Sequence, residues 1–175
     1  MKLRKRMMGL LLAVAVAAGS FLGTPVRAEA ANTIAKGIDV SKYQGAVNWS
    51  AVKNAGYSFA FIKIGSAKSG LDPYYAANMA GANAAGLKVG AYIYSYATTV
   101  EGAITEAQFA IAAQEPYTVS YPVVFDLEDS VHKNMTPEQL ASLAVAFCST
   151  VQSAGYYPMV YSSKNWMTGK IAATP

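Results

Sequence analysis

A helical pattern that ends in Ala-Gly and is followed by a short apolar run recurs three times in this 175-residue chain. The three pairs are Ala55-Gly56 before residues 57–63, Ala85-Gly86 before residues 87–94, and Ala154-Gly155 before residues 156–161. Glycine directly after the last helical residue is a frequent helix stop. Helix, stop and strand in series form βαβ units, so this repeat predicts an α/β fold with parallel strands.

The repeat and the apolar runs place the expected elements along the chain. We expect strands at residues 37–40, 59–64, 88–94, 123–126 and 159–161. We expect helices at residues 49–55, 74–85, 100–114 and 137–154, with another beginning near Ser163. A β/α barrel and a doubly wound sheet would both fit. Because an eight-stranded barrel typically takes about 250 residues, we expect the chain to stop short of a complete domain.

The first 30 residues have the pattern of a secretory signal peptide. Four basic residues precede an apolar stretch at residues 7–22, and small residues at Ala28 and Ala30 offer a cleavage site. An uncleaved membrane anchor is the alternative, since about 16 apolar residues approach the lower limit for a spanning helix. We therefore expect a secreted, extracellular protein with one domain at residues 31–175.

The charge of the expected mature chain excludes one class of partner. Five of the 14 Lys and Arg and one of the 10 Asp and Glu precede residue 31, which leaves 14 − 5 = 9 basic and 10 − 1 = 9 acidic residues. No Arg follows Arg27. Clustered Arg and Lys neutralise phosphates in nucleic-acid complexes, so we expect no nucleic-acid partner. The single cysteine, Cys148, excludes an internal disulfide and is expected to be a buried thiol.

Two carboxylates, Asp126 and Glu128, directly follow the apolar run at residues 121–125. Residues two apart in a strand point to the same side, so two like charges emerge together from a buried segment. Three explanations fit: a metal site, acid/base chemistry, or a turn that caps the next helix. Ligands bind at the carboxyl ends of parallel strands, where Asp39, Tyr94 and Tyr161 are expected to join the pair.

Acids beside aromatic rings suit a carbohydrate substrate. Sugar C–H faces stack on rings, while carboxylates transfer protons and stabilise developing oxocarbenium charge. The expected rim is poor in basic groups, with Lys63 the nearest, so phosphate substrates are not expected. Asp129 is expected to cap a helix, Trp49 to pack in the core, and His132, in a polar loop, to lie at the surface.

The chain resembles glycoside hydrolase family 25 over residues 34 to about 166. The resemblance rests on residues 37–45 (GIDVSKYQG), Asn48-Trp49, Asp72-Pro73-Tyr74 with Asn78, residues 85–92 (AGLKVGAY) and residues 122–128 (PVVFDLE). Members are lysozymes of the N-acetylmuramidase type, built on an irregular parallel β/α barrel. The resemblance implies cleavage of the β-1,4 bond between N-acetylmuramic acid and N-acetylglucosamine in peptidoglycan, without a cofactor or metal and by a monomer.

The resemblance also implies roles for individual residues. Glu128 would be the general acid, and Asp126 would stabilise the anomeric cation by orienting the substrate's 2-acetamido group or as a nucleophile. Asp39 would be the supporting acid. Tyr92, Tyr94 and Tyr161 would line the sugar cleft, and we expect Lys63 at the substrate too. The family's later strands, with a further acid, have no counterpart before Pro175, so we expect a domain truncated at its C-terminus.

Two other functions fit the same residues. A metal-dependent hydrolase would use Asp39, Asp126 and Glu128 as oxygen ligands for magnesium. A non-catalytic module would bind cell-wall glycan in the same cleft without turning it over.

Overall fold

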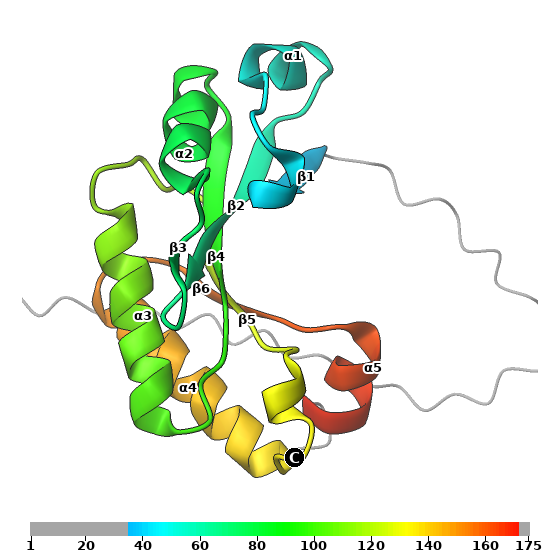
Figure 1. Cartoon of the computed structure of the whole chain (residues 1–175), viewed down its shortest axis with the longest axis vertical. Coiled ribbons are helices and arrows are strands. Elements are labelled where there is room, and N and C mark those ends of the chain that lie inside the picture. Colours follow the sequence, from blue (N-terminus) through cyan, green and yellow to red (C-terminus); the bar gives the residue numbers. More distant parts are fainter. Residues whose placement is uncertain (1–34, 172–175) are drawn as a thin grey trace, which may run out of the picture. The chain divides into compact units, whose positions relative to one another are not determined.

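Five parallel strands form the centre of this computed structural model, which describes residues 35–171 (Figure 1). They follow the order β1-β2-β4-β5-β6 across the sheet. Their bounds are β1 (Gly37–Val40), β2 (Phe59–Ser66), β4 (Lys88–Tyr94), β5 (Val123–Asp126) and β6 (Pro158–Tyr161). The predicted parallel series is therefore confirmed. The predicted signal peptide at residues 1–30 lies outside the described residues.

The helices also follow the prediction. They are α1 (Trp49–Asn54), α2 (Tyr75–Ala84), α3 (Val100–Gln114), α4 (Pro137–Ser153) and the short α5 (Lys164–Trp166), which continues into a π-helical turn at Met167–Ile171. Thr136 and Gln139 form a capping box at the start of α4, as the sequence predicts. Gly56, Gly86 and Gly155 have φ of 84°, 69° and 87°, a backbone conformation that glycine adopts without strain and that ends each helix.

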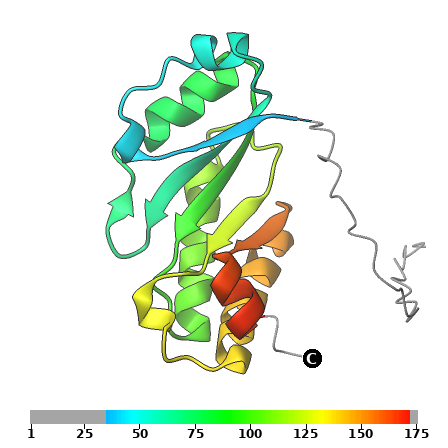
Figure 2. The ribbon, with the colours of Figure 1, turned by 90° about the vertical axis from the view of Figure 1, so that its right-hand side faces the viewer.

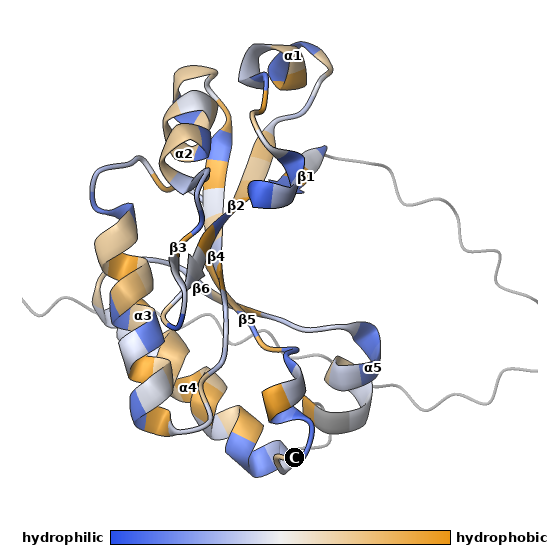
Figure 3. Ribbon diagram, in the orientation of Figure 1, coloured by the Kyte–Doolittle hydropathy of each residue, from blue (hydrophilic) through white to orange (hydrophobic). Residues whose placement is uncertain are grey.

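One face of the sheet is apolar and covered by helices. Ile62, Ile93 and Phe125 alternate along their strands with residues of the opposite face and are fully buried. Helices α2, α3 and α4 pack on this side (Figures 1 and 2), and Figure 3 shows apolar residues along α3 and α4. The rings of Phe125 and Phe147, from β5 and α4, stack with centroids 4.4 Å apart. The core lies between this face and these three helices.

The opposite face carries polar and aromatic side chains. It presents Lys63 of β2, Tyr92 and Tyr94 of β4, Asp126 of β5 and Tyr161 of β6, all at alternate positions of their strands. None of α2, α3 or α4 covers this face (Figure 2). The alternation thus separates a structural side of the sheet from a side that is open to a ligand.

The sequence did not predict the two-residue strand β3 (Gly70–Leu71), which pairs antiparallel with the end of β2. The register of β2 against β4 shifts between Lys63 and Gly65, so a bulge turns the chain toward β3. Gly65 has φ of 133°, and a Cβ there would collide with the carbonyl oxygen of Gly70. The turn therefore requires glycine. No helix within residues 35–171 has the length and hydropathy to cross a membrane.

The stacked pair in the core gives a first prediction. Phe147→Ala removes a fully buried ring that fits against Phe125. We expect a loss of about 3–5 kcal/mol in the free energy of unfolding, measured by urea denaturation. Val145→Ala, on the same helix at a position 64% exposed, is the matched control and should change stability little. Equal losses in the two variants would contradict this packing of α4 on the sheet.

Candidate functional site

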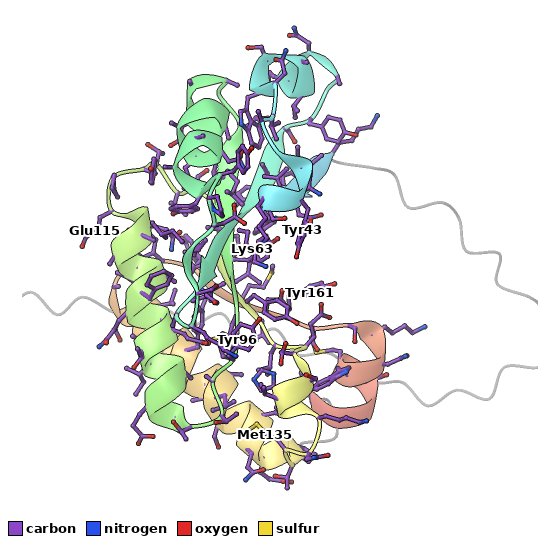
Figure 4. All side chains as sticks on the ribbon, viewed as in Figure 1. Tyr43, Lys63, Tyr96, Glu115, Met135 and Tyr161 are labelled. Atoms are coloured by element: carbon purple, nitrogen blue, oxygen red, sulfur yellow. The ribbon has the colours of Figure 1, made fainter. Side chains whose placement is uncertain are left out.

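A cavity of about 530 Å³ opens on the face of the sheet that α2, α3 and α4 do not cover. All seven residues predicted for the site line it. Figure 4 shows Tyr43, Lys63 and Tyr161 together on this side of the sheet. The lining residues are Asp39, Ser41, Tyr43, Phe61, Lys63, Tyr92, Tyr94, Val124, Asp126, Glu128, Met159 and Tyr161.

Strand register brings the polar residues of the cavity together. Lys63 of β2 pairs with Tyr92 of β4, and Asp126 of β5 pairs with Tyr94 on one side and Tyr161 on the other. In a parallel sheet, residues that are level in register project side by side on the same face. Segments up to about a hundred residues apart in sequence therefore form one row across the sheet.

Leu127 orients the two central acids. Its side chain is fully buried, its N–H donates to the Tyr161 carbonyl at 2.8 Å, and its carbonyl accepts from the Ser162 hydroxyl at 2.7 Å. Both backbone bonds attach it to the end of β6. Because Leu127 points into the core, its neighbours Asp126 and Glu128 are both directed to the cavity.

Asp126 is the most perturbed acid of the site. Asp126 is 7% exposed, and its Oδ1 has no hydrogen-bond partner in the part of the chain that is described. The pKa of Asp126 is raised to about 7, mainly by burial and then by the negative charge of Glu128, against the opposing effect of the Lys63 ammonium. Asp126 therefore holds a proton up to near-neutral pH in the empty cavity. Glu128 is only half-buried.

Tyrosine rings and a cation form the wall beside these acids. The Lys63 ammonium lies 4.9 Å from the centroid of the Tyr94 ring and 6.0 Å from that of Tyr92. The Tyr94 hydroxyl donates to Asp129 Oδ2 at 3.1 Å. Burial raises the pKa of Tyr92 and Tyr94, so both phenols stay neutral. Lys63 is therefore held on the rings, close enough to Asp126 to influence its charge.

The structure also shows where three residues lie that the sequence analysis placed outside the site. Asp129 caps the 3-10 helix η2 (Ser130–His132) by accepting from the Val131 N–H at 2.9 Å, and this bond lowers its pKa. Trp49 packs in the core. Both predictions are confirmed. The surface position expected for His132 is wrong: η2 turns the ring inward, where it is fully buried, with Nε2 2.9 Å from the Ala97 carbonyl oxygen.

Five lining residues were not predicted. Three of them, Phe61, Val124 and Met159, lie two positions before Lys63, Asp126 and Tyr161, so the two-residue period of a strand would have found them. The other two follow β1. Ser41 caps the 3-10 helix η1 (Lys42–Gln44), whose Tyr43 is 80% exposed at the cavity. Asp72 fixes η1 by accepting from the Lys42 N–H at 2.9 Å.

Within residues 35–171, no group of three or more His, Cys, Asp or Glu is arranged to hold a metal ion. Asp39, Asp126 and Glu128 line the same cavity, but they do not form such a group. The expected metal-dependent alternative thus has no preformed oxygen cage in the described residues.

Two curated proteins resemble parts of the chain. Lysozyme M1 of Streptomyces globisporus is 41% identical over 75 residues, which cover 43% of this chain and 26% of that protein. The uncharacterized protein YegX of Escherichia coli is 28% identical over 143 residues, which cover 78% of this chain and 51% of that protein. The chain thus spans about half or less of the curated relatives it matches.

Solved structures and a family model agree on the fold. The bacterial lysozyme of Streptomyces coelicolor superposes with a TM-score of 0.66 at 25% identity, over 78% of this chain and 66% of that chain. The muramidase of Trichobolus zukalii superposes with a TM-score of 0.66 at 24% identity, over 78% of this chain and 69% of that chain. The model for glycosyl hydrolases family 25 matches residues 38–174. The chain belongs to glycosyl hydrolases family 25.

Proposed function

We propose that this protein is a secreted peptidoglycan hydrolase that cleaves the β-1,4 bond between N-acetylmuramic acid and N-acetylglucosamine. The observation that carries the proposal is the carboxyl pair: a buried Asp126, whose pKa burial raises, beside Glu128 in a tyrosine-lined cavity. Family membership and the lysozyme among the relatives support the substrate class. Glycosidases use two carboxyl groups at the scissile bond.

In the proposed reaction, Glu128 donates a proton to the leaving glycosidic oxygen. Glu128 is half-buried at the mouth of the cavity, where it can reach a bond of a bound glycan. Asp126 lies deeper and stabilises the positive charge that develops at the anomeric carbon, through the 2-acetamido group or as a nucleophile. Asp39 supports the site from β1. The two central acids therefore differ in depth, which suits different tasks.

The location of the proton changes along this reaction. In the empty cavity burial favours the proton on Asp126, whereas the reaction needs Asp126 ionised and Glu128 protonated. Positive charge that develops at the anomeric carbon as the bond breaks favours the ionised form of the nearer carboxyl. We propose that Asp126 loses its proton in the reacting complex, while Glu128 carries the proton that goes to the leaving oxygen.

The aromatic wall binds the glycan in this proposal. Tyr92, Tyr94 and Tyr161 line the cavity with Phe61 and Met159, and sugar rings place their C–H faces on such rings. Tyr161 is half exposed, and the charge of Glu128 is the main cause that raises its pKa. Lys63 is fixed on Tyr94, where it meets the polar groups of the substrate and moderates the charge of Asp126.

The central prediction concerns Glu128. Glu128→Gln keeps the size of the side chain but removes the acidic proton, so we expect release of reducing sugar from cell walls to fall at least about 100-fold. Wall binding and the melting temperature should stay those of the wild type. Glu115→Gln, at an exposed position remote from the cavity (Figure 4), is the matched control and should retain full activity.

The same assay separates the alternatives. A wild-type chain that binds walls without releasing reducing sugar is a glycan-binding module and not an enzyme. Loss of activity in excess chelator would indicate a metal-dependent hydrolase. Either result, or near-wild-type lysis by Glu128→Gln, would overturn the proposal.

A second prediction concerns the pKa of Asp126, measured by carboxyl-carbon NMR. We expect a midpoint near 7. Glu128→Gln should lower this midpoint because a like charge is removed, and Lys63→Met should raise it because an opposite charge is removed. A midpoint near the ordinary value of about 4 would contradict the burial of this carboxyl.

The same pKa predicts how stability depends on pH. Between about pH 4 and pH 7 the folded chain keeps the Asp126 proton that the unfolded chain has lost. Stability should therefore fall as the pH rises through this window, by up to about 4 kcal/mol. Asp126→Asn should remove that part of the fall, as measured by urea denaturation across the window.

A further inference from the structure

A buried carboxyl lies in the middle of α3, away from the cavity. Glu106 is 3% exposed on α3, whose other buried residues are Ala103, Ala107, Ala110 and, at its end, Gln114. Its Oε1 accepts from the Tyr96 N–H at 2.9 Å, and its pKa is raised by burial against the opposing effect of the Ser95 hydroxyl. An alanine-rich helix face has no need of a carboxyl for packing. This side chain instead contacts the loop that follows β4.

The only histidine of the chain contacts the same loop. His132 is fully buried, and its Nε2 lies 2.9 Å from the Ala97 carbonyl oxygen. A carbonyl oxygen only accepts, so Nε2 carries the hydrogen and donates. The ring also packs edge-to-face on Trp166 with centroids 6.4 Å apart. His132 belongs to η2, directly after Asp129 and the catalytic Glu128 of the proposed reaction.

These contacts connect the end of β4 with the end of β5. Tyr94, the last residue of β4, lines the cavity, and its ring packs edge-to-face on that of Tyr96 in the following loop with centroids 5.3 Å apart. Asp126 is the last residue of β5, and Glu128 follows it. Besides the His132 bond, the Ser95 N–H donates to the Asp126 carbonyl oxygen at 3.0 Å, and Tyr94 donates to Asp129. Residues 95–97 are thus held by α3 on one side and η2 on the other.

We propose that Glu106 and His132 are positioning residues that hold residues 95–97 between them and so fix the Tyr94 and Tyr96 rings relative to Glu128. This inference rests on the proposed function. Glu106 and His132 touch no substrate; they act through the backbone of the loop. The two loops then behave as one unit, and a glycan stacked on the Tyr94 ring meets Glu128 at a set distance.

The burial of these groups favours positioning over simple packing. Glu106 Oε2 and His132 Nδ1 are buried atoms without a hydrogen-bond partner among the described residues, and such atoms destabilise a fold. Apolar side chains of similar size would pack α3 and η2 without that penalty. Residues that break the usual rules of packing are found mainly where function requires a particular geometry.

The test compares four variants of the full chain. Glu106→Leu removes the acceptor of the Tyr96 N–H, and His132→Phe removes the donor to Ala97 while keeping a ring against Trp166. Glu106→Gln keeps an acceptor for the Tyr96 N–H. Gln114→Leu is the matched control, because Gln114 is fully buried on the same helix and, among the described residues, its side chain bonds only the Ala110 carbonyl oxygen at 2.9 Å.

Two readouts are needed: hydrogen exchange of the amides of residues 95–97, and kcat and KM for wall digestion. We expect Glu106→Leu and His132→Phe to raise amide exchange in this segment and to lower kcat about tenfold or more, as a misplaced acid would. Glu106→Gln should restore wild-type exchange and kcat. Gln114→Leu should change neither readout, even if it shifts the melting temperature.

Wild-type exchange and kcat in both Glu106→Leu and His132→Phe would overturn the inference, as would an equal loss of kcat in Gln114→Leu. If Glu106→Leu does not fold, His132→Phe decides by the same two readouts. If the wild-type chain digests no wall, the proposed function fails, and exchange alone then decides whether these residues hold the loop.

Discussion

The site depends on the two-residue alternation of side chains along the parallel strands. In β5, Val123 and Phe125 are buried toward the helices, while Val124 and Asp126 face the cavity. A shift of one residue in register would exchange these sets and bury the acid under α4. Stacking of Phe125 on Phe147 opposes such a shift. The packing of the core therefore also fixes the direction of the site acids.

Electrostatics follow from that placement. Asp126 lies deep in the cavity with little contact with water, and Leu127 directs Glu128 to the same side, so the charge of Glu128 adds to burial in raising the pKa of Asp126. Lys63 moderates this repulsion from β2 while lying against Tyr94. Each residue acts through neighbours on adjacent strands. The fold thus keeps a proton on Asp126 before any substrate is bound.

Most of the fold was predictable because local signals agreed with one another. Helix stops at Gly56, Gly86 and Gly155 and the capping box at Thr136 fixed the order of elements, and parallel pairing follows from that order. Strand ends then predicted which acids and tyrosines meet. Strand β3 was not predicted because a strand of two residues is too short to show an alternating pattern. Its only signal in the sequence is Gly65, whose positive φ requires glycine.

His132 shows where sequence reasoning failed. Its neighbours are polar, which indicates a surface loop, but a three-residue helix capped by Asp129 turns the ring into the core. Glu106 is similar, since a charged residue in a helix is usually solvated. Both positions depend on contacts with residues about ten or more positions away, between loops that only the tertiary fold brings together. Such contacts leave no periodic pattern in the sequence.

The most direct measurement is to identify the sugar at the new reducing end. Purified peptidoglycan is digested with the full chain, the products are reduced with borohydride, and the amino-sugar alcohol is identified by mass spectrometry. Cleavage as proposed produces the alcohol of N-acetylmuramic acid, and Glu128→Gln produces none. The alcohol of N-acetylglucosamine, or no new reducing end from the wild-type chain, would contradict the account.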